Sequence, residues 1–192
     1  MEKRFTNKIV VVTGATQGIG LACAERLHEE GATVCAIQRG QSKLFDSFKF
    51  DLSKEQDCSK SIDVIVKKYG RIDVLVNNAG IMKESSLMDT SLEDWNQTIS
   101  VNLTAPFLLS KFAMPFLIES EGCIVNIGSI EGIGVNPNHT AYCSSKAGLH
   151  GLTRSIAVDH GKDGVRCNAV APGWIDTELN EDFINSMPDS DH

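Results

Sequence analysis

Tyr142 and Lys146 form the pair whose side chains and spacing most directly suggest chemistry. Residues four positions apart lie on one face of a helix, so a helix here would bring the phenol and the ammonium together. A tyrosine phenol titrates near 10 in water, and a cation about 4 Å away at an effective dielectric of about 20 stabilises the phenolate by about 4 kcal/mol. We therefore predict that Tyr142 is a general acid/base whose pKa Lys146 lowers towards neutrality. The alternative is two unrelated surface residues at helical spacing.

The positions of two further polar residues, Ser129 and Asn102, also suggest a role in the site. Ser129 comes just after a predicted strand, and open α/β sheets bind ligands at the carboxyl ends of their strands. Its hydroxyl could stabilise a carbonyl oxygen on which charge develops, although a serine after a strand is more often a turn residue. Asn102 lies four residues before Pro106, which has no N–H to bond the Asn102 carbonyl. A water could bind that carbonyl, and a simple helix kink is an equal alternative.

A glycine-rich turn follows the apolar run that leads to Thr13. Gly14, Gly18 and Gly20 let the backbone approach a bulky anion, and the free N–H groups of the next helix can bind phosphate oxygens. The spacing is T-G-x-x-x-G-x-G between a predicted strand and a predicted helix, which indicates a dinucleotide-binding turn. An ordinary tight turn is the alternative.

The elements that position these residues alternate between strand and helix patterns. The predicted strands are 8–13, 33–38, 48–52, 72–76, 123–127 and 165–170. The predicted helices are 19–30, 54–69 capped by Ser53, 92–118 capped by Ser91 and interrupted by two prolines, and 140–160. This alternation predicts one α/β domain over residues 1–192 with a parallel sheet.

Taken together, the motifs occur in the order found in one family. They are Thr13-Gly14 with Gly18 and Gly20, Asp51, Asn77-Asn78-Ala79-Gly80, Asn102, Ser129, Tyr142 with Lys146, and Pro172-Gly173. Over its whole length the chain resembles the compact, single-domain short-chain dehydrogenases/reductases. The resemblance implies a Rossmann-type, doubly wound parallel sheet with helices on both faces and strand order 3-2-1-4-5-6. It also implies a nicotinamide cofactor and hydride transfer between a small alcohol and a carbonyl, as in 3-oxoacyl reductases or sugar dehydrogenases. A dinucleotide-binding sensor or an assembly subunit without chemistry is the alternative.

The same resemblance implies roles for individual residues. Lys146 also holds the nicotinamide ribose, and Asn102 holds a water that links Lys146 to solvent. The expected cofactor-binding residues are Gly14, Gln17, Gly18, Ile19 and Gly20 in the turn, Gln38 and Arg39 after the second strand, Asp51 and Leu52 beside the adenine, Asn78, Ala79 and Gly80 beside the adenosine ribose, Tyr142 and Lys146, and Pro172, Gly173, Ile175 and Thr177 beside the nicotinamide amide.

The second strand ends without the acidic residue that NAD-preferring members carry. Arg39 suits a 2′-phosphate, whereas Gln17 lies where NADP-preferring relatives often have a basic residue. We expect NADP, with NAD as the other option. Asp51 could equally be a helix-capping carboxylate.

The substrate is not identified by these motifs. Glu131, Asn136, His139 and Trp174 flank the expected catalytic residues and are candidates for the pocket wall. Taken singly, each is more often a solvated loop residue.

Composition and charge narrow the class of partner. The chain has 192 residues and a net charge of −7, which disfavours nucleic acids and anionic membranes as partners. The six cysteines lack paired spacing, so we expect a reducing compartment, no metal site and a cytoplasmic protein without a signal peptide or membrane span. The resemblance implies a homodimer or homotetramer built through the helices in 92–118 and 140–160.

One departure from the family pattern concerns the C-terminal end. The family continues into a substrate-covering segment, another helix and a seventh strand, whereas this sequence stops at His192. We expect a longer natural protein or a partner chain that covers the sixth strand, with 178–187 as the start of a substrate lid. Without a seventh strand, Val165, Cys167 and Ala169 are predicted to form an exposed apolar edge.

Overall fold

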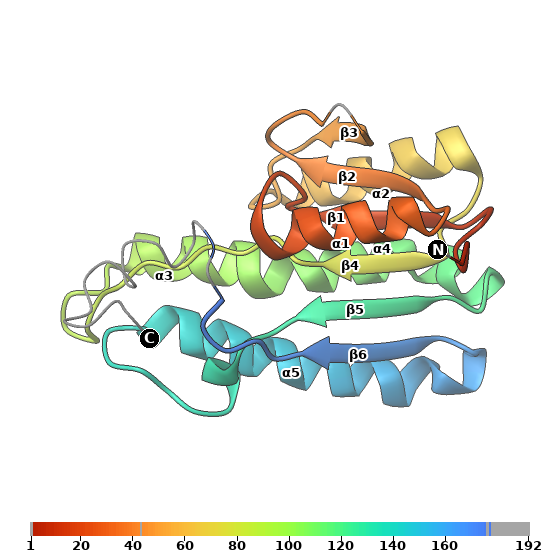
Figure 1. The fold of residues 1–192 in the computed structure, drawn as a ribbon. Coiled ribbons are helices and arrows are strands. Elements are labelled where there is room, and N and C mark those ends of the chain that lie inside the picture. The colour runs from red at the N-terminus through yellow and green to blue at the C-terminus, as the bar shows by residue number, and fades with distance from the viewer. Residues whose placement is uncertain (1, 43, 176, 178–192) are drawn as a thin grey trace.

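A computed structural model describes residues 2–42, 44–175 and 177. Six parallel strands form one sheet in the order β3-β2-β1-β4-β5-β6 (Figure 1), which confirms the predicted order. The strands are β1 (Ile9–Thr13), β2 (Thr33–Gln38), β3 (Asp46–Lys49), β4 (Val74–Asn77), β5 (Cys123–Ile127) and β6 (Arg166–Val170). The helices are α1 (Gly18–Glu29), α2 (Glu55–Tyr69), α3 (Leu92–Ile99), α4 (Ala105–Glu119) and α5 (Thr140–His160), with short helical turns at Ser100–Thr104, Ile130–Gly132 and Gly161–Asp163.

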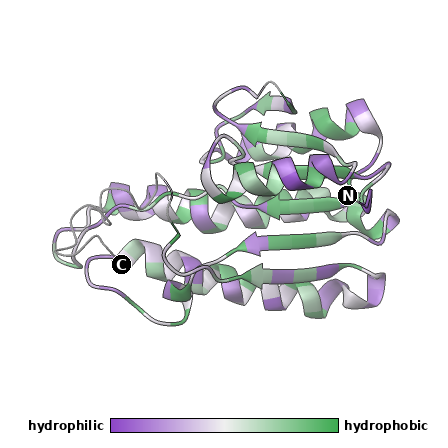
Figure 2. Cartoon of the chain, viewed as in Figure 1, coloured by the Kyte–Doolittle hydropathy of each residue, from purple (hydrophilic) through white to green (hydrophobic). Residues whose placement is uncertain are grey.

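The central strands are apolar on both sides because helices cover both faces. All five residues of β1 are buried. Val11 belongs to a core built with α2, α4 and α5, whereas Val10 and Val12 belong to a second core built with α1. Figure 2 shows the hydrophobic colour concentrated in these inner strands. The unbroken β-branched pattern of β1 therefore reflects burial of this strand on both sides, by α2, α4 and α5 on one face and by α1 on the other.

Two predicted elements have different boundaries. The third strand is Asp46–Lys49 rather than 48–52, because Cys35 to Gln38 of β2 pair with residues 46 to 49 and leave Asp51 for the turn before α2. Ser53 does not cap α2; its hydroxyl donates to the Asp51 carboxylate at 2.7 Å, and Lys54 is the N-cap.

The predicted helix 92–118 is two helices joined by a π-turn. Ser91 caps α3 as predicted, accepting from the Asp94 N–H at 3.0 Å. Between α3 and α4 the turn Ser100–Thr104 widens, and the Ala105 N–H bonds the Ser100 carbonyl. A wider turn accommodates the missing N–H of Pro106 without a break in the chain direction.

The prediction of an exposed apolar edge at the sixth strand is wrong for two of the three residues that it named. Val165 and Cys167 are buried in the core shared with α5, whereas Ala169 and Val170 are exposed. The expected lid, 178–187, lies outside the described residues.

One helical run, Leu92–Glu119, is long and apolar enough to cross a membrane by length and composition alone. Half of its most apolar window is buried inside the protein, and a core helix passes the same test.

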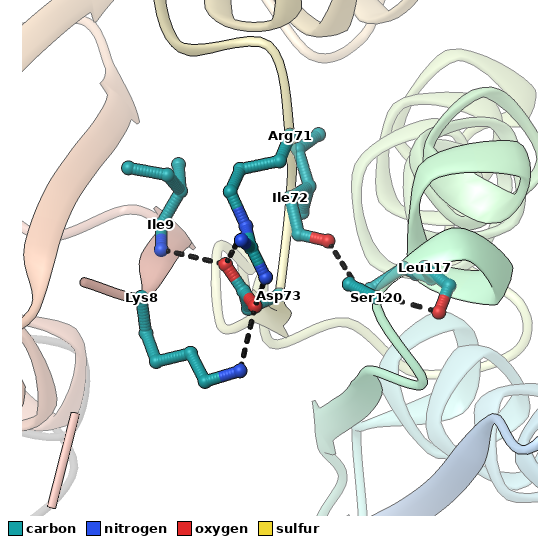
Figure 3. Close-up of polar contacts among 7 residues, drawn as sticks. All are labelled: Lys8, Ile9, Arg71, Ile72, Asp73, Leu117 and Ser120. Atoms are coloured by element: carbon teal, nitrogen blue, oxygen red, sulfur yellow. Dashed lines mark hydrogen bonds and ion pairs between the residues drawn. The ribbon is translucent and has the colours of Figure 1, made fainter. Parts of the chain in front are cut away.

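The amino ends of the strands are tied together by a buried carboxylate. Asp73, just before β4, accepts from the Ile9 N–H at 2.9 Å, from the Lys8 ammonium at 2.9 Å and from Arg71 (Figure 3). Burial alone would raise the pKa of Asp73, but these donors outweigh it, and the pKa lies below its ordinary value. The cluster therefore fixes β1 against β4 at the end of the sheet opposite the glycine turn.

Candidate active site

The glycine turn is held in place by the loop that follows β4. Gly14 and Gly18 have φ of +66° and +55°, which favour glycine. The Thr13 hydroxyl accepts from the N–H groups of Asn78 and Ala79 at 2.9 Å, and the Asn78 amide donates to the carbonyls of Thr13 and Gly14 at 3.0 Å. A Cβ on Gly20 would overlap the Asn78 amide and the Gly14 carbonyl. Gly20 is therefore required for packing beneath the turn.

A cavity of about 720 Å³ opens at the carboxyl ends of the strands. This volume is in the range of small-molecule and cofactor sites. The predicted residues that line it are Gly14, Gln17, Gly18, Ile19, Gln38, Arg39, Asp51, Leu52, Asn78, Ala79, Gly80, Ser129, Tyr142, Lys146, Pro172, Gly173, Ile175 and Thr177. Two predicted residues, Gly20 and Asn102, lie behind the wall rather than on it.

Several lining residues were missed by the sequence analysis. They are Thr16, Ile37, Gly40, Phe50, Ile81, Met82, Gln97, Val101, Ile127, Gly128 and Ile130. Most directly adjoin a predicted site residue, so proximity to the motifs was the available signal. Met82, Gln97 and Ile127 do not adjoin a predicted residue, and Gln97 is the most distant of the three, because only the packing of α3 brings it to the cavity.

Ser129, Tyr142 and Lys146 meet where β5 ends against the first turns of α5. The Ser129 hydroxyl accepts from the Glu131 N–H at 3.1 Å. It also lies close enough to Tyr142 to act on the pKa of the phenol. The Lys146 ammonium donates to the Ile127 carbonyl at 2.8 Å and lies 5.5 Å from the centre of the Tyr142 ring. The helical spacing of Tyr142 and Lys146 is thus realised on one face of α5, facing the end of β5.

The pKa of Tyr142 is shifted in the opposite direction to the prediction. Burial raises it above its ordinary value, the neighbouring Ser129 hydroxyl acts to lower it, and the negative charge of Glu131 raises it further. Burial also lowers the pKa of Lys146 to about 8. The prediction considered the attraction of a cation alone, whereas removal of both groups from water dominates here.

The side chain of Asn102 makes contacts that the sequence did not predict. Its amide accepts from the Ile81 N–H at 2.8 Å and donates to the Ile81 carbonyl at 2.8 Å and to Ser145 at 3.1 Å. Asn102 is buried within the π-turn. It therefore fastens the loop beyond Gly80 to the helix that carries Tyr142 and Lys146.

The wall at the end of β2 contains the residues relevant to cofactor choice. The Gln38 amide donates to Ser47 at 3.1 Å, while its carbonyl oxygen is buried and has no partner within the described part of the chain. Arg39 is exposed at the cavity. Asp51 accepts from the N–H and hydroxyl of Ser53, so it lines the cavity and also closes the turn before α2. An unsatisfied acceptor and a cation at this wall fit the hydroxyl and phosphate groups of a dinucleotide ribose.

Two of the four candidate substrate residues are buried rather than solvated. Glu131 is 6% exposed and His139 1% exposed, and their side chains are joined by a 2.8 Å contact between Oε2 and Nδ1. Asn136 donates to Glu131 Oε1 at 2.8 Å. Glu131 and Trp174 line the main cavity, whereas Asn136 and His139 stand behind Glu131.

The strand order, the glycine turn at the end of β1 and the cavity at the carboxyl ends of the strands define a Rossmann-type dinucleotide-binding protein. The sequence matches the short chain dehydrogenase family over residues 8–187, and the chain belongs to that family.

Known relatives agree with this assignment. The chain is 36% identical to a meso-2,3-butanediol dehydrogenase of Serratia marcescens, over 97% of this chain and 78% of that one. It is 37% identical to the 3-oxoacyl-acyl-carrier-protein reductase FabG of Thermotoga maritima, over 93% of this chain and 78% of that one. The ligand-free aldohexose dehydrogenase of Thermoplasma acidophilum superposes with a TM-score of 0.91 at 40% identity, covering 98% of this chain and 76% of that one.

The chain is thus an oxidoreductase that uses a nicotinamide cofactor, NAD or NADP, and acts on alcohol or carbonyl substrates.

Proposed function

We propose that Tyr142 is the general acid/base of this oxidoreductase, that Ser129 binds the reacting oxygen and that Lys146 supplies the neighbouring positive charge. The bound nicotinamide supplies or accepts the hydride. Tyr142 exchanges the proton of the reacting oxygen, and Ser129 donates to that oxygen as its charge develops. Asn102 is a positioning residue that holds Ile81 and α5. The substrate is a small carbonyl or alcohol, of the 3-oxoacyl or sugar-alcohol kind acted on by the relatives.

The observation that carries this proposal is the convergence of Ser129, Tyr142 and Lys146 on the cavity that the glycine turn also lines. A nucleophilic or hydrolytic site would need a base beside the serine hydroxyl. Here the neighbour of that hydroxyl is a phenol, next to a buried ammonium. Such a phenol can donate a proton to an alkoxide or accept one from an alcohol.

We also propose that NADP is preferred. Arg39 is exposed at the cavity wall and, within the described residues, takes part in no ion pair, so its guanidinium is available to a 2′-phosphate. The Gln38 carbonyl oxygen would accept from a ribose hydroxyl with either cofactor. Fluorescence titration is expected to give tighter binding of NADPH than of NADH.

The assembly and the location of the protein are also proposals. A single unit over residues 1–192 would assemble as a dimer or tetramer through α4 and α5, which expose Phe107 and Val158. The net charge of −7 agrees with a cytoplasmic protein that binds neither nucleic acid nor membrane.

The Tyr142→Phe variant tests the catalytic assignment. The variant keeps the ring and removes the exchangeable proton, so turnover of an alcohol panel should fall by about a hundredfold to ten-thousandfold. NADPH titration should be nearly unchanged. Retained turnover would contradict the role of Tyr142. A wild-type chain that binds cofactor and turns over no alcohol or carbonyl would favour the sensor or assembly alternative.

A further inference from the structure

Glu131 is a buried carboxylate on the cavity wall that the proposed reaction does not use. It lies in the helical turn Ile130–Gly132, two residues after Ser129. Its N–H bonds the Ser129 hydroxyl, so the residue is attached directly to the group expected to bind the reacting oxygen. The side chain is 6% exposed and lines the same cavity as Ser129 and Tyr142.

Three donors hold this carboxylate in place. Asn136 donates to Oε1 at 2.8 Å, while His139 and the Cys143 thiol contact Oε2 at 2.8 and 3.2 Å. Burial alone would raise the pKa of Glu131, but the three hydrogen bonds outweigh it and the pKa lies below its ordinary value. Glu131 is therefore an anion at neutral pH.

The carboxylate retains room for a further donor. An ionised carboxyl group accepts about four hydrogen bonds, two on each oxygen. Within the described residues Oε2 has two partners and Oε1 has one. One acceptor position on Oε1 is thus left, on a residue that lines the cavity.

The surroundings place this acceptor beside the reacting end of the cavity. Cys143, which contacts Oε2, follows Tyr142 in the chain. The ring of His139, the other partner of Oε2, lies 6.3 Å from the Tyr142 ring between centres. The negative charge of Glu131 acts on the Tyr142 hydroxyl strongly enough to contribute to its raised pKa. A substrate whose oxygen is bound by Ser129 and Tyr142 therefore has its neighbouring carbon close to an anion.

We propose that Glu131 is a specificity-determining residue that accepts a hydrogen bond from a hydroxyl group on the carbon next to the reacting one. The preferred substrate is then a neutral vicinal diol, or the α-hydroxycarbonyl compound formed from it. A carboxylate at that carbon is excluded, because two anions would meet in a site sheltered from water. This inference rests on the proposed function and adds the substrate class.

Three alcohols that share the reacting CH(OH)CH₃ group test the inference. They are 2,3-butanediol, 2-butanol and lactate. The carbon next to the reacting one carries a hydroxyl group in the diol, is a methylene group in 2-butanol and is the carboxylate carbon in lactate. For the wild-type chain, kcat/KM with NADP⁺ should be about tenfold or more higher for the diol than for 2-butanol, and lowest for lactate. A lower kcat/KM for the diol than for 2-butanol, or a preference for lactate, overturns the inference even if no variant folds.

The Glu131→Gln variant removes the charge at nearly constant volume. The ratio of diol to 2-butanol should fall about tenfold, and the ratio of lactate to 2-butanol should rise. The pH profile of kcat/KM should move to lower pH, because loss of the neighbouring anion lowers the pKa of Tyr142. Glu131→Asp keeps the charge and should recover part of the diol preference.

The Glu84→Gln variant is a matched control. The Glu84 carboxylate lies 3.9 Å from His139 Nε2, on the side of the ring away from the Glu131 contact, and Glu84 is not among the cavity residues. Its substrate ratios should equal those of the wild type.

The outcomes separate the inference from the function on which it rests. Unchanged ratios and an unmoved pH profile in Glu131→Gln would mean that Glu131 only fastens the loop, while turnover of 2-butanol would keep the proposed function intact. Absence of turnover with every alcohol and carbonyl tested would overturn both.

Discussion

Buried charges lie at both ends of the sheet, but their surroundings differ. At the amino end, Asp73 is contacted by Lys8, Arg71 and the Ile9 N–H, and Glu30 is bound by Arg4 and Arg26. Those partners lower the pKa of Glu30 to about 2. At the carboxyl end, Lys146 has a neutral partner, the Ile127 carbonyl, and burial lowers its pKa to about 8.

The difference indicates which end stabilises the fold and which end is kept for a ligand. Asp73 and Glu30 are more stable as anions in the folded chain than in the unfolded chain, so their ionisation favours folding. Lys146 is less stable as a cation in the folded chain, so its burial opposes folding. A buried charge that destabilises the protein and faces a cavity is typical of a functional site. The following substitutions test this contrast.

Replacement of Lys146 by Met should produce the largest effect, a loss of activity without a loss of stability. Loss of the positive charge beside the reacting oxygen and the phenol should lower kcat/KM by about a hundredfold to a thousandfold. A pKa that falls from 10.5 to about 8 means that burial of the ammonium costs about 3 kcal/mol below pH 8. The variant should therefore unfold at the same or a higher temperature, as measured by calorimetry at pH 7. A clearly lower unfolding temperature would show that Lys146 stabilises the fold, and the two ends of the sheet would then not differ in this respect.

Replacement of Asp73 by Asn should have the opposite effect, a loss of stability without a loss of activity. Loss of the charge-assisted hydrogen bonds should reduce the free energy of unfolding by about 2 kcal/mol, with kcat/KM per folded molecule unchanged. The folded pKa of Asp73 lies below the unfolded value of 3.8, so its contribution is present above about pH 4 and is lost as the pH falls through the folded pKa. Urea unfolding from pH 7 to pH 2 should show the wild type and the variant converging.

Asp63→Asn serves as the control for Asp73, because Asp63 is an exposed aspartate on α2. Its free energy of unfolding should change by less than about 0.5 kcal/mol. An equal loss of unfolding free energy in both variants would mean that the contacts of Asp73 with Lys8, Arg71 and the Ile9 N–H do not stabilise the fold.

Replacement of Arg39 by Ala should have the smallest effect and should act on one cofactor. Loss of a charge-assisted contact to the 2′-phosphate should raise the Kd for NADPH about tenfold and leave the Kd for NADH unchanged. Lys49, exposed at the end of β3 and outside the cavity, provides the control as Lys49→Ala. Parallel loss of affinity for both cofactors in Arg39→Ala would place the guanidinium elsewhere on the dinucleotide.

Much of the fold and of the cavity followed from local patterns. The β-branched run of β1 and the alternation of strands with helices predicted a parallel α/β sheet. The strand order came from the resemblance to the family, and the structure confirms it. The motifs identified most of the lining residues because each lies at the carboxyl end of a strand or on the first turns of α5. The third strand was displaced because its register depends on pairing with β2 rather than on its own apolar pattern.

What the sequence determined by itself is the family, the parallel sheet and most of the residues that surround the cavity, since these depend on local patterns and on the order of the motifs along the chain. Tertiary structure alone decided the environment of those residues. Glu131 and His139 are eight positions apart in a loop without periodicity, and only packing against α5 buries them together. The direction of the pKa shift of Tyr142 likewise depends on how much water the folded chain removes, a quantity set by residues distant in sequence and not by the Tyr142–Lys146 spacing.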